Sequence, residues 1–202
     1  NTSLSAHNDE RIDEYYWLNQ RGEKKVIDYL NSENSYRNEY MKDYKKLEEN
    51  IFLEIKSRIK EDDSSVPYYD NGYYYYTRYE KDKQYPIYCR KKESLKSEEE
   101  VLIDANIMSK GHEYFRVGSI DISPDNKIMA YSVDTVSRRL YTIYFMDLDT
   151  RKIYEGKIPN TSGGVTWTND NSAIFYDKKD IETLRTDRVM KYIDIGKQEG
   201  AK

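Results

Sequence analysis

The spacing of hydrophobic positions changes once along the chain, near Pro67. Between Gly22 and Pro67 there is neither glycine nor proline, and the apolar residues recur every three or four positions. This spacing predicts helix with one apolar face. Because about 40 residues exceed the usual helix length, we expect two helices, with the break at Asn31–Ser35 or at Lys42–Asp43. The positions on the apolar face are Val26, Ile27, Leu30, Tyr40, Tyr44, Leu47, Ile51 and Ile55.

Residues 1–10 are small and polar and show no periodicity, which predicts an irregular arm. We therefore expect residues 1–66 to form an N-terminal arm and lead helices, and we call this stretch the lead segment.

After Pro67 the chain consists of short runs of β-branched and aromatic residues separated by Asn, Asp and Gly, which predicts strands and turns. One pattern recurs: residues 120–126 (IDISPDN) match residues 165–171 (VTWTNDN), and an apolar strand follows in both cases. A weaker copy surrounds Asp70-Asn71-Gly72. A period near 45 residues with about four short strands per unit is typical of β-propeller blades.

The fold class predicted from these patterns is mainly β, with an N-terminal α-helical segment and a partial, open β-propeller. Residues 67–202 would supply the first two to three blades, whereas a closed ring needs ~4–8. We therefore expect further sequence in a parent protein, or self-association through the open propeller edge.

Composition narrows the class of protein. The 22 Tyr, 4 Phe and 2 Trp favour a folded chain over a disordered one. A net charge of −4 disfavours nucleic acid as a partner. No apolar run is long enough to cross a membrane, and Cys89, His7 and His112 are too few for a structural zinc site. We expect no cofactor and no metal; the compartment, cytoplasmic or periplasmic, stays open.

The sequence contains no nucleophile elbow (Gly-x-Ser-x-Gly) and no phosphate-binding loop, so we expect no catalytic residue in this chain. Two groups are weak candidates for interdomain contacts or substrate gating. The aromatic residues Tyr15, Tyr16 and Trp17 either anchor the lead segment on another domain or form local core. The acidic residues Glu61, Asp62 and Asp63 form either a rim facing cationic substrate or a solvated connector.

Several long stretches resemble the prolyl oligopeptidase family, and within it the oligopeptidase B (protease II) branch. At the start of the chain these are residues 13–18 (DEYYWL) and 26–34 (VIDYLNSEN). Further on they are residues 58–68 (RIKEDDSSVPY), 75–80 (YYTRYE) and 85–90 (YPIYCR). Residues 132–135 (SVDT) and 158–163 (IPNTSG) continue the resemblance, which covers nearly the whole chain from Asp13.

The resemblance implies a serine peptidase in which a seven-bladed propeller covers an α/β-hydrolase domain and admits only short peptides. It implies cleavage after Arg or Lys by a Ser, His and Asp triad that lies in the C-terminal domain, so no triad residue has a counterpart here. The implied partners are short cationic peptides and the parent's own hydrolase domain, onto which the lead segment would wrap.

Two alternatives stay open. A propeller without catalytic activity could serve as a scaffold for a protein partner, although such a scaffold has no need of about forty helical residues. An inactive family member without its triad is the other alternative.

Overall fold

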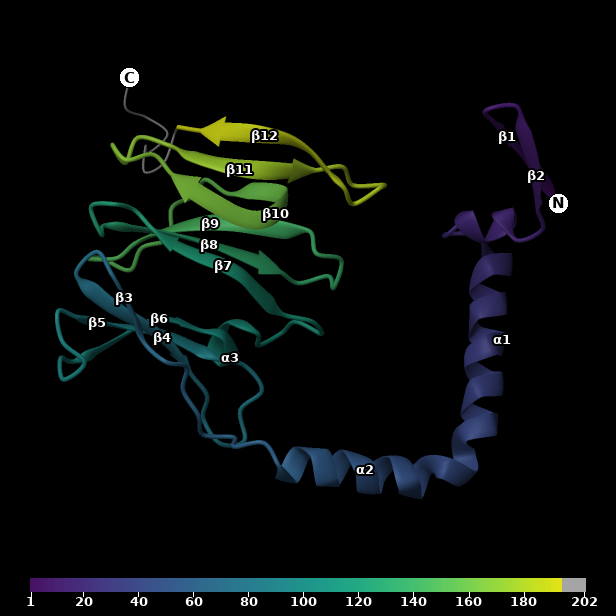
Figure 1. The fold of residues 1–202 in the computed structure, drawn as a ribbon, viewed down its shortest axis with the longest axis horizontal. Coiled ribbons are helices and arrows are strands. Elements are labelled where there is room, and N and C mark those ends of the chain that lie inside the picture. The colour runs from purple at the N-terminus through teal and green to yellow at the C-terminus, as the bar shows by residue number, and fades with distance from the viewer. Residues whose placement is uncertain (194–202) are drawn as a thin grey trace. The chain divides into compact units, whose positions relative to one another are not determined.

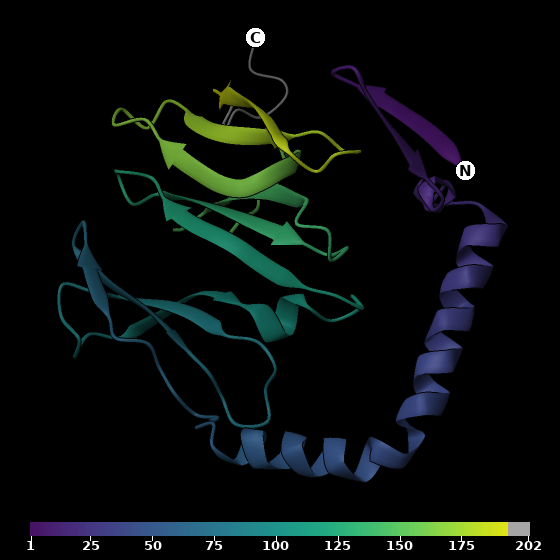
Figure 2. The same cartoon turned by 45° about the vertical axis from the view of Figure 1, so that its right-hand side comes forward.

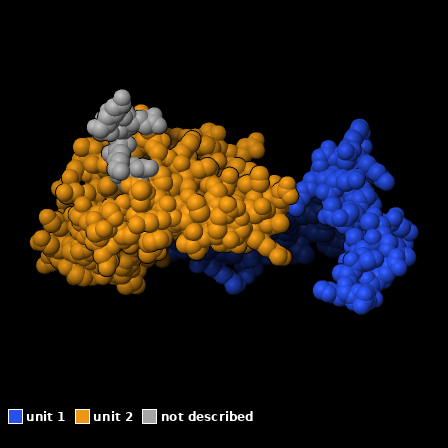
Figure 3. All heavy atoms as spheres, turned by 90° about the horizontal axis from the view of Figure 1, so that it is seen from above, with its two compact units in different colours: residues 1–60 blue, residues 61–202 orange. Residues whose placement is uncertain are grey.

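The computed structural model describes residues 1–193 and divides the chain into two compact units, residues 1–60 and residues 61–202. Figure 3 shows the two units in different colours. Residues 194–202 of the predicted propeller segment lie outside the described residues.

The first unit begins with a β-hairpin, so the prediction of an irregular arm over residues 1–10 is wrong. Strand β1 (Thr2–Ala6) pairs with β2 (Asp9–Asp13) in antiparallel register. The two turn residues, His7 and Asn8, have φ values of 55° and 63°, the left-handed conformation of the tightest hairpin turns. Because most of the strand residues are exposed and polar, no hydrophobic alternation signals this hairpin in the sequence.

The helical part of the first unit follows a short 3₁₀ turn, η1 (Tyr16–Asn19). Helix α1 (Lys24–Met41) and helix α2 (Lys45–Ser57) are joined by a second 3₁₀ turn, η2 (Lys42–Tyr44), where the chain bends in Figure 1. Two helices with a break at Lys42 are therefore confirmed, and the alternative break at Asn31–Ser35 is wrong. Residues 31–35 lie within α1, where the Ser35 hydroxyl donates to the Asn31 carbonyl one turn earlier at 2.9 Å.

The second unit begins with a four-stranded antiparallel sheet, which we call the first blade (Figures 1 and 2). Its strands occur in sequence order: β3 (Tyr68–Asp70), β4 (Tyr73–Arg78), β5 (Ile87–Lys92) and β6 (Glu99–Asp104). The short helix α3 (Ala105–Met108) follows β6 and leads to the second sheet.

The second sheet has six strands in consecutive antiparallel order. They are β7 (Arg116–Ile122), β8 (Ile128–Asp134), β9 (Tyr141–Asp147), β10 (Ile158–Trp167), β11 (Ile174–Lys179) and β12 (Thr186–Tyr192). Strand β10 serves two blades: Ile158 and Thr161 pair with β9, while Thr161 and residues 165–167 pair with β11. The second blade therefore comprises β7–β9 with the start of β10, and the third comprises the end of β10 with β11 and β12.

This arrangement confirms a mainly β fold with an N-terminal helical segment and a partial β-propeller. Two apolar clusters fill the seams between blades. The first lies between the first and second blades and includes Tyr75, Met129 and Tyr131. The second lies between the second and third blades and includes Phe145 and Ile174. Full burial of each such side chain contributes about 1.5–3 kcal/mol.

Two glycines enclose the ring of Tyr141, which is buried where β10 passes from one blade to the next. A Cβ on Gly118 would lie 2.5 Å from the Ser132 Oγ and 2.7 Å from the Tyr141 ring. A Cβ on Gly163 would lie 2.9 Å from the same ring, and φ at Gly163 is +99°. Both strands bulge at these glycines, so the close approach of the backbone to Tyr141 requires residues without a side chain.

Candidate functional site

Three asparagines occupy equivalent turns, one at the end of the inner strand of each blade. Asn71, Asn126 and Asn171 have φ values of 43°, 61° and 61°, a conformation that asparagine tolerates better than most residues. The Asn71 Nδ2 donates to the Pro124 carbonyl at 2.8 Å, and the Asn126 Nδ2 donates to the Asn71 carbonyl at 3.1 Å. The Asp125 amide donates to the Asn171 Oδ1 at 3.0 Å. These contacts, which we call the asparagine ladder, fix the spacing of the inner strands.

A cavity of about 200 Å³ lies between the first blade and β7. Residues of the two inner strands, β3 and β7, form part of its wall. The lining residues are Ser65, Tyr68, Asp70, Tyr75, Tyr76, Thr77, Tyr88, Cys89, Leu102, Ile120, Asp121 and Ile122.

Asp121 of β7 is half-buried, and it pairs with Ala130 of the second cluster, whereas its neighbours Ile120 and Ile122 pack in the first cluster. Burial raises its pKa above the ordinary value of 3.8, and a hydrogen bond with Ser119 opposes that effect. No salt bridge within residues 1–193 involves Asp121. The Trp167 indole nitrogen donates to the Asp121 carbonyl at 3.3 Å and holds this stretch of β7 against β10. The backbone of β7 is thus fixed at Asp121.

The tyrosines of the cavity have raised pKa values. Burial, followed by the charges of Asp70 and Asp121, raises the pKa of Tyr68. Burial also raises the pKa of Tyr88 and of Tyr75. At neutral pH these side chains are therefore neutral rings that carry a hydroxyl donor. The rings of Tyr68 and Tyr75 are stacked on each other, with their centres 5.5 Å apart.

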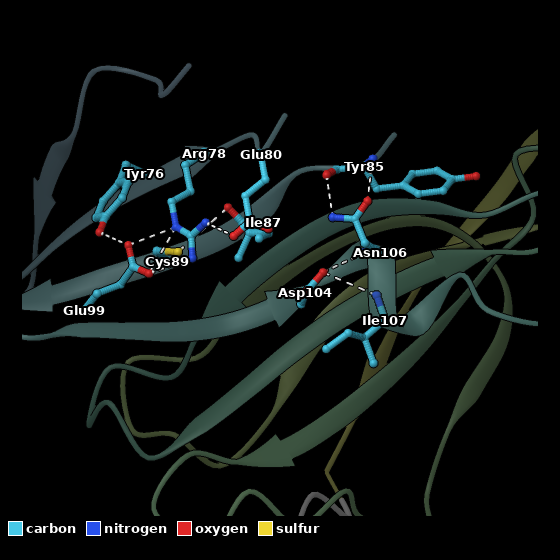
Figure 4. Close-up of polar contacts among 10 residues, drawn as sticks. All are labelled: Tyr76, Arg78, Glu80, Tyr85, Ile87, Cys89, Glu99, Asp104, Asn106 and Ile107. Atoms are coloured by element: carbon cyan, nitrogen blue, oxygen red, sulfur yellow. Dashed lines mark hydrogen bonds and ion pairs between the residues drawn. The ribbon is translucent and has the colours of Figure 1, made fainter. Parts of the chain in front are cut away.

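A separate polar network lies on the face of the first blade that carries Tyr76 and Arg78 (Figure 4). Arg78 binds both carboxylate oxygens of Glu99 at 3.0–3.1 Å, and the Tyr76 hydroxyl donates to Glu99 at 2.6 Å. Although burial acts to raise it, these hydrogen bonds lower the pKa of Glu99. Burial raises the pKa of the neighbouring Cys89 thiol to about 11, so this sulfur stays protonated and is a poor nucleophile at neutral pH.

The link between the first and second blades is fixed by side chains that Figure 4 also shows. Asp104 accepts the backbone amides of Asn106 and Ile107 at 2.9 and 3.3 Å and so caps α3. The Asn106 side chain bonds both the amide and the carbonyl of Tyr85, at 2.9 and 2.8 Å. These two hydrogen bonds join the start of α3 to the loop before β5.

The predicted aromatic candidates lie in the first unit. Tyr15 and Tyr16 are exposed, with 64% and 42% of their surface accessible. Trp17 packs edge-on against Tyr29 at 5.4 Å between ring centres, and the Lys25 Nζ lies 4.7 Å from the Trp17 ring. Trp17 thus has an aromatic and a cationic neighbour within the first unit, while the two tyrosines present open surface.

The predicted acidic candidates lie at the start of the second unit. Glu61 accepts the amide of Asp82 at 3.4 Å, and the Asp63 carbonyl accepts the amide of Tyr79 at 2.7 Å. Asp62 is exposed. None of the three lines the cavity, and the contacts of Glu61 and Asp63 attach the start of the second unit to the segment after β4.

Sequence reasoning did not single out the half-buried Asp121, although the repeat carried a signal. When the two copies are aligned, Asp121 in the first copy corresponds to Thr166 in the second. Asp121 stands between Ile120 and Ile122, and Thr166 stands between Val165 and Trp167. A carboxylate inside an apolar strand, where the second copy has a neutral residue, is the departure that marks this position. Tyr75 packs in the first cluster and also lines the cavity.

The residues that line the cavity do not include the groups of a hydrolytic site. Its lining includes no histidine that could act as a base for Ser65, Thr77 or Cys89. In the part of the chain that the structure describes, no three His, Cys, Asp or Glu side chains are grouped closely enough to hold a metal ion. No helix within that part is long and apolar enough to cross a membrane.

The second unit consists of propeller blades, each with an inner strand. Comparison with known proteins identifies its family. The family profile "Prolyl oligopeptidase, N-terminal beta-propeller domain" matches residues 1–199. The chain belongs to the prolyl oligopeptidase family of serine peptidases and represents its N-terminal propeller region.

Curated relatives in this family are peptidases. The chain is 38% identical to dipeptidyl aminopeptidase BI of Pseudoxanthomonas mexicana over 94% of its own length and 28% of the relative's. It is 33% identical to protease 2 of Moraxella lacunata over 86% of its length and 26% of the relative's. The chain thus spans about a quarter of the length of these relatives.

Solved structures of oligopeptidase B have the same fold. The enzyme from Leishmania major superposes with a TM-score of 0.83 at 34% identity, covering 92% of this chain and 27% of that one. The enzyme from Trypanosoma brucei gives a TM-score of 0.81 at 30% identity, covering 94% and 27%. These matches confirm the predicted resemblance to oligopeptidase B.

Proposed function

We propose that this chain is the lead segment and first blades of a serine oligopeptidase that hydrolyses short peptides after Arg or Lys. The observation that carries the proposal is the continuous likeness to oligopeptidase B, at 34% identity and a TM-score of 0.83 over 92% of the chain. The hydrolysis belongs to a C-terminal hydrolase domain of the parent protein, and the propeller restricts the size of the peptides that reach it.

The exposed aromatic side chains of the first unit support a role for the lead segment in binding that hydrolase domain. Tyr36, Tyr40 and Tyr44 lie one helical turn apart, with successive ring centres 6.4 Å from each other, and all three are exposed. Over residues 24–57 Val26 is the one buried side chain. Large apolar surfaces of this kind are stabilised by covering them with another domain, and Tyr15 and Tyr16 would extend the contact.

A second candidate activity is the release of dipeptides from a free N-terminus. It is favoured by the 38% identity to a protein named dipeptidyl aminopeptidase BI. The two activities differ in whether the substrate must carry a free terminal ammonium.

Both activities are tested with the full-length protein that contains this chain. Fluorogenic tetrapeptides with Arg, Lys, Pro or Ala before the cleaved bond are assayed with free and with acetylated N-termini. We expect rapid cleavage after Arg and Lys whether or not the terminus is acetylated, and loss of activity after treatment with a serine-directed sulfonyl fluoride. Cleavage that requires a free terminus would replace the oligopeptidase with the dipeptidyl activity.

The scaffold alternative is addressed by the same assay. A propeller that only binds a protein partner would leave all these peptides intact and would not react with the sulfonyl fluoride. Size restriction is tested by comparing a tetrapeptide with a folded protein that contains the same cleavage sequence, which we expect to stay uncut.

A further inference from the structure

We propose that Asn71 is a site of spontaneous deamidation, at which the backbone nitrogen of Gly72 displaces ammonia from the Asn71 side chain. The modification falls in the turn that joins the first blade to the second through the asparagine ladder. It weakens that connection. The inference is independent of the peptidase assignment, because the reaction needs no partner other than water.

The residue that follows an asparagine controls this reaction. Its backbone nitrogen must reach the side-chain carbonyl carbon, and a side chain on that residue obstructs the approach. Asn71 precedes Gly72, which is the one Asn-Gly pair in the 202 residues. In the two equivalent turns the asparagine precedes Lys127 or Ser172. Among the three asparagines of the ladder, Asn71 therefore has the one unhindered neighbour.

The surroundings of Gly72 leave its nitrogen free to react. A Cβ on Gly72 would have no atom within 4 Å, so the turn is open around it. Asp70 and Tyr73 form the pair that closes the hairpin, and over residues 1–193 no turn or loop backbone hydrogen bond is donated by the Gly72 amide. An amide that donates no hydrogen bond loses its proton to hydroxide more readily than a bonded one. The deprotonated nitrogen is the nucleophile.

Asn71 is also the most accessible of the three asparagines. It is exposed, whereas Asn126 and Asn171 are half-buried. Its Nδ2 donates to the Pro124 carbonyl at 2.8 Å, and the side chain must leave Pro124 before it can turn towards its own backbone. Because a single hydrogen bond at an exposed position opens readily, the ladder slows the reaction without preventing it.

The chemical steps balance without an enzyme or a cofactor. The Gly72 nitrogen forms a bond to the Asn71 Cγ, the bond from Cγ to Nδ2 breaks, and the proton of the Gly72 amide leaves with Nδ2 as ammonia. Water then opens the resulting five-membered imide. Addition at Cγ gives aspartate, and addition at the main-chain carbonyl gives isoaspartate, in which Cβ and Cγ become part of the main chain.

Either product weakens the contact between the first two blades. Aspartate lacks the Nδ2 donor and places a carboxylate oxygen opposite the Pro124 carbonyl, so two acceptors face each other. Isoaspartate lengthens the main chain of a two-residue turn and shifts the carbonyl that accepts from the Asn126 Nδ2 at 3.1 Å. Both hydrogen bonds of Asn71 in the ladder are therefore open to loss.

The site is tested by incubating the folded full-length protein at mildly alkaline pH and digesting samples at acidic pH. Mass spectrometry measures loss of the amide in each turn peptide, and chromatography separates aspartate from isoaspartate. We expect Asn71 to convert at least about tenfold faster than Asn126 or Asn171, a difference in activation free energy of about 1.4 kcal/mol. This comparison within one molecule needs no variant.

Gly72→Ala places a methyl group beside the attacking nitrogen and should slow conversion of Asn71 by at least about tenfold. Gly164→Ala is the matched control, because a Cβ at Gly164 also has no atom within 4 Å, and it should leave the rate unchanged. The proposed site would be overturned if Asn71 converted no faster than Asn126 and Asn171, or if Gly72→Ala converted as fast as the unaltered protein.

The effect on the blades is measured with Asn71→Asp, which carries the aspartate product from the start. We expect the slowest backbone amides of β3–β6 to exchange at least about fivefold faster in this variant, the change that loss of one hydrogen bond gives. Asn34→Asp, at an exposed position of α1, is the control and should leave their exchange unchanged. Identical exchange in Asn71→Asp and the unaltered protein would overturn the proposed weakening of the blade contact.

Discussion

Asn71 and Asn126, 55 residues apart in the sequence, lie in adjacent blades, and each joins the other's turn by a side-chain hydrogen bond. Asn71 donates to the carbonyl of Pro124 at 2.8 Å, and Asn126 donates to the carbonyl of Asn71 at 3.1 Å. Both residues have positive φ. The same side chain that tolerates the turn conformation therefore also connects one blade to the next.

Substitution of Asn126 should separate these two roles. Asn126→Gly keeps the left-handed turn and loses the inter-blade hydrogen bond, which should lower the free energy of unfolding by about 1 kcal/mol. Asn126→Ala adds the strain of a Cβ at positive φ and should cost about 1 kcal/mol more. Urea denaturation of the full-length protein measures both. Asn34→Ala, at an exposed position of α1, is the control and should change stability by less than about 0.5 kcal/mol. Equal stability of the Gly and Ala variants would contradict the turn argument.

The glycine pair around Tyr141 gives a second stability prediction. Gly118→Ala places a methyl group 2.5 Å from the Ser132 Oγ and 2.7 Å from the ring of Tyr141, and should destabilise the fold by about 1–3 kcal/mol through overpacking. Gly164→Ala adds the same methyl group where no atom lies within 4 Å and should be nearly neutral. The midpoint of thermal unfolding distinguishes them, and a Gly118→Ala variant as stable as Gly164→Ala would show that the strands shift without cost.

Asp121 should make stability depend on pH in an unusual direction for a carboxylate. Burial raises its pKa in the folded state above the ordinary value of 3.8, so the folded state binds the proton more tightly than the unfolded one. The contribution of Asp121 is therefore most favourable below pH 3.8 and declines as pH rises through the folded-state pKa. Asp121→Asn removes this decline. We expect the stability gain of the variant over the unaltered protein to grow between pH 4 and pH 7, measured by urea denaturation; a gain that shrinks with pH would contradict the burial argument.

The 202-residue chain, expressed by itself, should self-associate through β12. This strand lies at the edge of the six-stranded sheet within the described residues, and its Val189 and Met190 are 68% and 38% exposed. Exposed edges with apolar side chains favour pairing between molecules. Sedimentation velocity should give a mass above that of the monomer, and Val189→Lys should reduce it. A monomer at every concentration would refute this prediction. The same sample should not cleave an Arg-containing fluorogenic peptide.

Local patterns in the sequence predicted the features that depend on neighbouring residues. The helical spacing from Val26 to Ile55 predicted α1 and α2, and the copies at Ile120 and Val165 predicted the strands and turns of two blades. The helices depend on contacts between residues close in the sequence, and the blade strands and turns follow a short repeat. A single sequence displays both patterns directly.

Features that depend on distant or polar contacts could not be predicted in this way. The hairpin at residues 1–13 consists of backbone pairing between exposed polar strands, which leaves no hydrophobic pattern. The cavity brings Tyr68 of one blade to Asp121 of the next, and nothing in either local sequence specifies that pairing. Tyr73–Tyr76 alternate between the two faces of β4, so the same run serves the apolar seam with Tyr75 and the polar network with Tyr76.

Strand β10 also affects how the propeller fluctuates. Because one continuous strand pairs with β9 at its start and with β11 at its end, the second and third blades cannot separate without breaking backbone hydrogen bonds. No such shared strand joins the first blade to the second within the described residues, where apolar contacts, α3 and the asparagine ladder make the connection. We therefore expect the slowly exchanging backbone amide protons of β7–β12 to exchange as one cooperative unit. Those of the first blade should exchange independently and earlier.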